Sequence, residues 1–341
     1  MPTRSSLCSM ATMVRERRVS PVELVDAHFR QIAKHNPQLN AFVVLLEEQA
    51  REAAKQAEAA VMRENALGLL HGVPVTVKDS FDMAGLPTLC GSKSRVDHRA
   101  AEDATSVARL RAAGAIILGK TNCPEFLSNY ETDNFITGRT NNPWNLDYTP
   151  GGSSGGESAA ISSFCSAGGI GSDGGGSVRI PAHFCGIVAL KPTPGRVSAA
   201  GHYPVISHPG GLLGVAGPMA RTVNDVGLLF AALAGYDSQD PFSAPVPLRN
   251  PEAGSPRIGL MEQFYDVPVQ PEIRETVIKA ARTLEQIGYK VEPFRPRGIE
   301  RAPNLWWLFF GQLPAPMTKQ LIQGREQETH WTGTEFLATA L

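Results

Sequence analysis

The chain has 341 residues, of which 42% are hydrophobic, so it is long enough to bury one large core or two modest ones. Its formal net charge of −1 gives no electrostatic reason to expect nucleic acid or an anionic membrane as a partner. The five cysteines are scattered, odd in number and without a CxxC motif, which argues against a disulfide framework or a metal site. No secretory signal or apolar membrane span is evident, and we therefore expect a cytoplasmic protein.

The first predicted elements are two helices within residues 1–65, which would form an N-terminal helical layer. Ser20-Pro21-Val22-Glu23 is a capping box with proline at the first helical position. Apolar residues then recur at helical spacing until Asn36-Pro37, where we expect this helix to end. Residues 47–64, rich in Ala and Glu, predict the second helix.

Strands and helices alternate in the part of the chain that follows. Residues 72–79 are an apolar, β-branched run that predicts a buried strand. A helix capped by Asp103 and a strand over 115–118 come next, a further helix begins at Thr222, and residues 258–294 predict another βαβ unit. This alternation predicts an α/β fold with a mixed, mostly parallel sheet covered by helices.

The most informative stretch is residues 151–181, which is rich in Gly and Ser but encloses an apolar segment that a flexible linker would lack. Two glycine clusters each deliver serines: Ser153 with Ser154, and Ser177 after Gly174, Gly175 and Gly176. Consecutive glycines let backbone N–H groups converge on one point, which supplies an oxyanion hole beside a nucleophile. The stretch contains no histidine, and the nearest upstream base is Lys78, at the end of the 72–79 strand.

Four motifs, VPVTVKD, PGGSSGGE, GSDGGGSVRIPAHFCG and LKPTPG, occur in this order, and together they resemble the amidase signature family of serine hydrolases. The resemblance covers roughly residues 20–300. It implies a Ser–cis-Ser–Lys triad with Ser177 as the nucleophile, Ser153 as a bridging serine after a cis peptide bond, and Lys78 as the base. The oxyanion hole would consist of N–H groups of Gly174, Gly175, Gly176 and Ser177. Gly174 departs from the family pattern, because many members have Thr or Ile there.

The resemblance also implies supporting residues around the triad: Ser154, Ser172, Asp173 and Arg179. Ser172 should form a hydrogen bond within the triad region, and Asp173 should form a buried pair with Arg179 that braces the glycine loop. Lys78 must be neutral to act as a base, so its pKa must fall by ~3 units from ~10.4. We therefore expect Lys78 to be buried and not closely paired with the adjacent Asp79.

Several other features allow different interpretations. Residues 169–174 spell GxGxxG, but no helix with a ribose-binding acid follows at the required spacing. Residues 151–155 spell the GxSxG of a nucleophile elbow, which would require a later histidine, and His330 is the only late one. Lys120 is a second candidate base, although the family comparison makes it a scaffold residue. The aromatic run at 306–310 is expected in the core, with a substrate wall or a membrane-facing patch as alternatives.

The predicted function is hydrolysis of a carboxamide C–N bond in a small linear substrate through an acyl-enzyme, with no cofactor. The alternatives are a transferase similar to the A subunit of glutamyl-tRNA(Gln) amidotransferase, and an inactive, shortened family member. We expect one amidase domain over 1–341, with the catalytic core at 66–300. The part at 301–341 should be incomplete, because family chains usually continue further. The sequence determines neither the amide nor the oligomeric state, for which a homodimer is one candidate.

Overall fold

The computed structural model describes residues 2–63, 66–206, 212–248 and 256–340. The chain forms two compact units, one of Met1–Leu248 with Phe310–Leu341 and the other of Arg249–Phe309. The βαβ unit that we expected within the catalytic core therefore belongs to the second unit.

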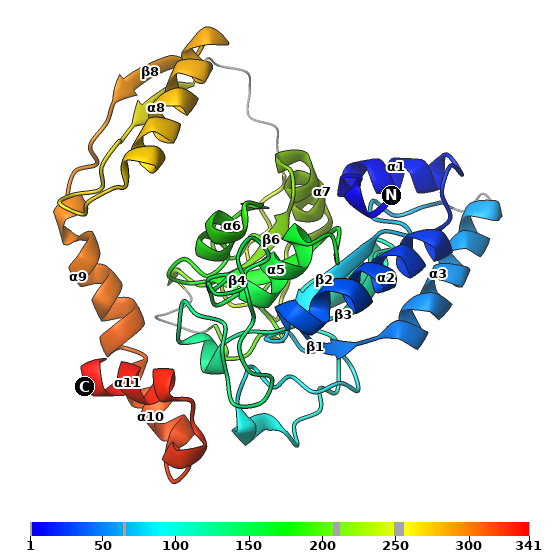
Figure 1. The fold of residues 1–341 in the computed structure, drawn as a ribbon, viewed down its shortest axis with the longest axis horizontal. Coiled ribbons are helices and arrows are strands. Elements are labelled where there is room, and N and C mark those ends of the chain that lie inside the picture. Colours follow the sequence, from blue (N-terminus) through cyan, green and yellow to red (C-terminus); the bar gives the residue numbers. More distant parts are fainter. Residues whose placement is uncertain (1, 64–65, 207–211, 249–255, 341) are drawn as a thin grey trace. The chain divides into compact units, whose positions relative to one another are not determined.

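A six-stranded mixed sheet forms the frame of the first unit (Figure 1). Its strands lie in the order β1 (Phe42–Leu45), β3 (Ile116–Thr121), β2 (Pro74–Lys78), β4 (Gly168–Asp173), β6 (Val215–Ala220) and β5 (Val188–Ala189). β3, β2 and β4 run parallel, whereas the pairings of β1 with β3, β4 with β6, and β6 with β5 are antiparallel. The predicted mixed sheet is confirmed, and its parallel part is confined to these three central strands.

Helices cover both faces of this sheet. One face packs against α1 (Leu7–Arg15), α4 (Thr105–Ala112) and α7 (Val223–Leu233), and the other against α2 (Pro21–Leu39), α3 (Glu47–Met62) and α5 (Gly155–Ser162). Successive side chains of a strand point to opposite faces. Val75 and Val77 of β2 therefore join the first apolar cluster, while Thr76 and Lys78 point toward α5. This alternation places the lysine on the α5 side of the sheet.

Two predicted helix boundaries differ from the structure. Ser20 caps α2 as predicted, but the helix continues through Pro37 to Leu39, so the predicted end at Asn36-Pro37 was wrong. Proline at position 37 removes the N–H that would bond to the carbonyl four residues earlier, but it does not end the helix, which stops at Asn40 in the left-handed region (φ 53°). Asp103 does not cap α4, because its carboxylate accepts hydrogen bonds from the Ala84 N–H and the Arg111 side chain.

The second unit contains the predicted βαβ arrangement, with β7 (Arg257–Leu260) and β8 (Lys290–Pro293) parallel and joined by α8 (Pro271–Gln286). α9 (Ala302–Trp307) follows, and its aromatic run is not a buried core, since Trp306 is 39% and Leu308 37% exposed.

The remaining helices of the first unit are α6 (Arg179–Cys185), α10 (Ala315–Ile322) and α11 (Trp331–Ala340). Short 3-10 helices lie at Pro2–Arg4, Lys93–Arg95, Glu125–Leu127, Ile299–Arg301 and Glu326–Glu328, and a π-helical turn at Leu308–Gln312. None of the helices in the described ranges is long and apolar enough to cross a membrane.

Candidate active site

The site lies where the carboxyl ends of two parallel strands meet. β2 ends at Lys78, and its neighbour β4 ends at Asp173 and leads into the glycine loop of residues 174–177. α5, which begins after Ser154, packs against both strands. In open α/β sheets this edge is the usual position of ligand sites. The chain topology thus brings Ser153 and Ser177, 24 residues apart in sequence, to the end of the Lys78 strand.

Lys78 is fully buried, and its side-chain nitrogen lies between two serine hydroxyls. Nζ is 2.7 Å from Ser153 Oγ and 3.1 Å from Ser172 Oγ, so the predicted hydrogen bond of Ser172 is confirmed. Burial lowers the pKa of Lys78 to about 8, because the charged form loses its hydration. The Gly152–Ser153 peptide bond is cis, as the family resemblance implied.

Ser177 is half-buried in the loop between β4 and α6. Its carbonyl accepts the Ser154 N–H at 3.0 Å, which fixes the two serine loops against each other. Among the hydrogen bonds of the described residues, none involves the Ser177 hydroxyl. Catalytic hydrogen bonds often form or shorten only when substrate binds, which accounts for a nucleophile hydroxyl without a partner among the described residues of the free protein. The catalytic roles of Ser177, Ser153 and Lys78 are predictions.

Asp173 holds the glycine loop from the protein interior. Its buried carboxylate accepts the N–H groups of Gly176 (2.9 Å), Val178 (3.0 Å) and Arg179 (3.3 Å), and it pairs with the Arg179 guanidinium at 2.9 and 3.0 Å. Burial raises the pKa of Asp173, but Arg179 and these N–H groups outweigh it and hold the pKa below its ordinary value. The Arg179 side chain is 53% exposed, so only one member of the predicted buried pair is buried.

Two glycines of the loop have contacts that bear on their predicted roles. The Gly176 N–H already donates to Asp173, so the prediction that it serves the oxyanion hole is corrected. Its φ of +135° lies in the region that favours glycine. The glycine at position 174 leaves room for a neighbouring side chain, since a Cβ there would lie 2.7 Å from Cε1 of Phe310. The Thr or Ile of other family members would collide with that ring.

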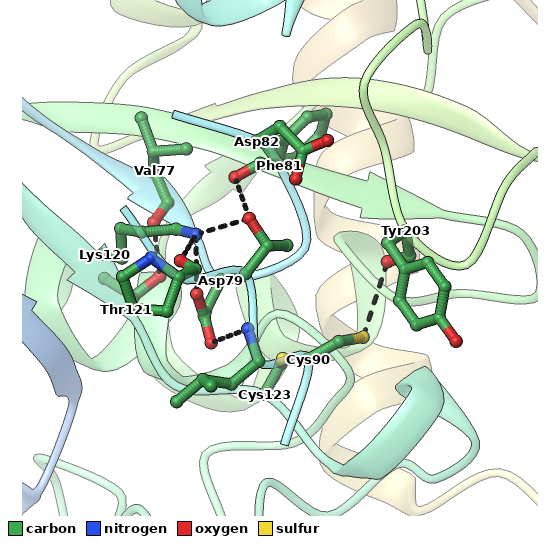
Figure 2. Close-up of polar contacts among 12 residues, drawn as sticks. Val77, Asp79, Phe81, Asp82, Cys90, Lys120, Thr121, Cys123 and Tyr203 are labelled. Carbon is green, nitrogen blue, oxygen red and sulfur yellow. Dashed lines mark hydrogen bonds and ion pairs between the residues drawn. The ribbon is translucent and has the colours of Figure 1, made fainter. Parts of the chain in front are cut away.

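Asp79, the neighbour of Lys78 in sequence, pairs with a different lysine. Its Oδ1 lies 2.7 Å from Lys120 Nζ, and both side chains are buried (Figure 2). Lys120 also donates to the Pro87 carbonyl at 2.6 Å and to Thr88 Oγ1 at 3.1 Å. The requirement that Asp79 leave Lys78 unpaired is therefore met, and the contacts of Lys120 agree with a scaffold residue.

Glu157 is a buried acid of the site that the sequence analysis did not single out. It lies in the first turn of α5, and its carboxyl group is 2.5 Å from Thr76 Oγ1 and 2.7 Å from Thr121 Oγ1. Burial raises the pKa of Glu157 to about 7. Its position in the sequence could have indicated this, because Glu157 is the one acid within the Gly- and Ser-rich motif PGGSSGGE.

The two competing motifs have structural explanations. The GxGxxG glycines lie in and after β4, where a Cβ at Gly169 would be 2.0 Å from Glu157 Oε1 and one at Gly171 would be 2.7 Å from Ser154 Oγ. These glycines therefore make room for buried groups of the candidate site. His330, which an elbow-type site would require, contacts Asp133 (3.6 Å) and Thr332 (2.8 Å). Within the described ranges, no group of three His, Cys, Asp or Glu side chains could hold a metal ion.

Comparison with known proteins identifies relatives over almost the whole chain. The model of the Amidase family matches residues 23–327. An indoleacetamide hydrolase of Bradyrhizobium diazoefficiens is 38% identical over 98% of this chain and 65% of its own length. The A subunit of glutamyl-tRNA(Gln) amidotransferase from Acidothermus cellulolyticus is 40% identical over 84% of this chain and 58% of its own length.

A solved structure shares the fold at similar coverage. A bacterial aryl acylamidase of the amidase signature family superimposes with a TM-score of 0.86 and 30% identity, over 98% of this chain and 72% of that one. The chain thus spans less than two thirds of the two curated relatives and about three quarters of the solved structure. The match of the family model over residues 23–327, together with this shared fold, shows that the chain belongs to the amidase signature family.

Proposed function

We propose that this protein hydrolyses the C–N bond of a small linear carboxamide through an acyl-enzyme on Ser177. The observation that carries the proposal is the buried Lys78, whose amine lies 2.7 Å from Ser153 Oγ and whose pKa burial lowers to about 8. A lysine that loses its proton this readily is suited to general-base catalysis. The loop that contains Ser177 is held against the loop that contains Ser153 by the hydrogen bond from the Ser154 N–H to the Ser177 carbonyl.

The proposed reaction has two proton-coupled steps. Ser177 Oγ attacks the amide carbonyl carbon while its proton passes to Ser153, and the Ser153 proton passes to neutral Lys78. The N–H groups of Gly174, Gly175 and Ser177 bind the oxyanion that forms on the carbonyl oxygen. Lys78 then returns the proton through Ser153 to the leaving amine. Water attacks the acyl-enzyme by the same relay, releases the carboxylic acid and restores the Ser177 hydroxyl.

Fluorophosphonate labelling tests this proposal without knowledge of the substrate. We expect the probe to modify Ser177, located by peptide mass spectrometry, and the labelling rate to increase as the pH rises through about 8, where Lys78 loses its proton. Ser177→Ala should abolish labelling, and Ser153→Ala should slow it strongly. Modification of Ser153 or Ser154 instead would favour an elbow-type hydrolase. A folded sample that is not labelled would favour the inactive family member.

The substrate that we propose carries an aromatic group. Two relatives are named for aromatic amides, indoleacetamide and aryl acylamides. In this chain the Phe310 ring occupies the space beside Gly174 in the glycine loop, and the Tyr130 hydroxyl donates to the Gly175 carbonyl at 2.8 Å. Aromatic rings at this position would favour a flat substrate group by stacking. We expect a higher kcat/KM for aryl amides than for alkyl amides of similar size, and Phe310→Ala should reduce that preference. Equal preference in both proteins would contradict this assignment.

The second candidate is a transferase like the A subunit of glutamyl-tRNA(Gln) amidotransferase, because relatives of that name are 35–40% identical to this chain. Glutaminase activity, or a companion protein that co-purifies, would favour it over an amidase that acts alone. We further propose a cytoplasmic location, since all five cysteines are free and four of them are buried.

A further inference from the structure

Glu157 forms a buried hydrogen-bond chain that runs from α5 into the sheet, beside the lysine of the proposed triad. Its Oε1 lies 2.5 Å from Thr76 Oγ1, and Thr76 Oγ1 lies 3.0 Å from Ser166 Oγ. The Ser166 hydroxyl donates to the Gly168 carbonyl at 2.8 Å. All three side chains are fully buried.

The hydrogens available to this chain can be counted. Each hydroxyl carries one hydrogen, and the hydrogen of Ser166 is directed to the Gly168 carbonyl. If Glu157 is a carboxylate, Thr76 must donate to it, and the 3.0 Å contact between Thr76 and Ser166 then contains no hydrogen. If Glu157 is protonated, it donates to Thr76, Thr76 donates to Ser166, and every contact is satisfied. The Thr121 hydroxyl donates to Oε2 in both cases, at 2.7 Å.

The geometry therefore points to a protonated Glu157 in the resting protein, and we propose that this proton keeps an anion from forming beside Lys78, so that Lys78 loses its own proton at a lower pH. Glu157 would then be a positioning residue for the proposed reaction, on which this inference rests. Burial raises the pKa of Glu157, which is the direction that the hydrogen count requires.

The carboxyl groups around Lys78 differ in whether they have a cationic partner. In the described part of the chain, Asp173 and Asp79 have cationic partners, Arg179 and Lys120, whereas the Glu157 carboxyl is bonded to hydroxyls only. The other titratable groups nearby are the thiols of Cys90 and Cys123 and the ring of His202.

Two of these other groups are uncharged near neutral pH. Burial raises the pKa of Cys90 and lowers that of His202 to about 3. An ionised Glu157 would add an anion that favours the charged form of Lys78 and removes the base.

Glu157→Gln gives the sharpest test, because the amide imitates a protonated acid: its N–H₂ donates to Thr76 and its oxygen accepts from Thr121. We expect the midpoint of the acid limb of the labelling rate against pH to shift by less than about 0.3 units. If Glu157 is ionised in the native protein, removal of that anion would lower the midpoint by about one unit or more, which would overturn the proposal.

Ser166→Ala is the matched variant, since Ser166 lies outside the proposed machinery. Without Ser166 Oγ, the Thr76 hydroxyl can donate only to Glu157. This loss favours the carboxylate form of Glu157, so in the native background the midpoint of the labelling rate against pH should rise. In the Glu157→Gln background the same change should have no effect on the midpoint. Equal shifts in both backgrounds would refute the proposed coupling.

Infrared spectroscopy reports on the proton without any activity. The difference spectrum of native protein minus Glu157→Gln at pH 6 should contain the carbonyl band of a protonated carboxylic acid, shifted in D₂O. A carboxylate band in its place would refute the proposal. If Glu157→Gln does not fold, the native protein alone is titrated, and the acid band should persist above the pH at which exposed carboxyls ionise. The infrared band does not depend on labelling of Ser177. A protein that shows the acid band but is not labelled would contradict the proposed function and leave the protonation of Glu157 supported.

Discussion

Lys78→Met should lower kcat for amide hydrolysis by about 10⁴-fold or more, the scale of loss when the base of a nucleophile–base unit is removed. The methionine fills the buried space of the lysine stem but has no nitrogen at 2.7 Å from Ser153 to take up the proton. The fold should survive, because an apolar side chain at this fully buried position carries no desolvation cost. Steady-state kinetics and a thermal melt of the same sample measure both quantities.

The controls for this substitution separate chemistry from folding. Lys55→Met changes an exposed lysine, 68% of whose side chain is accessible, and should leave kcat within about twofold. Ser177→Ala should cost as much as Lys78→Met, and the double variant should lose little more, because nucleophile and base act as a unit. A folded Lys78→Met protein that keeps a tenth of the native kcat would show that the base lies elsewhere.

Lys120→Met should lower the free energy of unfolding by about 3–5 kcal/mol, the usual cost of removing one partner from a buried ion pair. Asp79 would keep a buried carboxylate whose cationic partner is gone (Figure 2), and the Pro87 carbonyl would lose its donor as well. Equilibrium urea denaturation, followed by fluorescence and circular dichroism, measures the change. Both probes are needed because the chain has two compact units.

A second substitution shows whether the lost stability comes from the unpaired charge. Asp79→Asn in the Lys120→Met background removes the orphan carboxylate and should recover more than 1 kcal/mol of the loss, about the scale at which neighbouring residues couple. Lys55→Met, at an exposed lysine, again serves as the control and should change stability by less than about 0.5 kcal/mol. No recovery in the double variant would contradict the ion-pair explanation.

The sequence by itself determined the features that depend on local patterns. The capping box at Ser20, the β-branched run that becomes β2, and the βαβ unit of β7, α8 and β8 are all present as predicted. Motif order was enough to identify the family, because the serine and glycine clusters keep the family's order relative to Lys78. Such signals involve neighbours within a few turns of the chain, where side-chain spacing and backbone preference dominate.

The tertiary structure alone decided which buried polar groups become partners. Glu157 bonds to a threonine 81 residues away, Asp79 takes Lys120 rather than its neighbour Lys78, and Gly176 gives its N–H to Asp173. The strand β1 and the antiparallel outer pairings were also not predicted, since a run of four residues does not indicate which strand it pairs with. A buried polar group takes the partner that the packed backbone brings within about 3 Å, and residue spacing does not encode that distance.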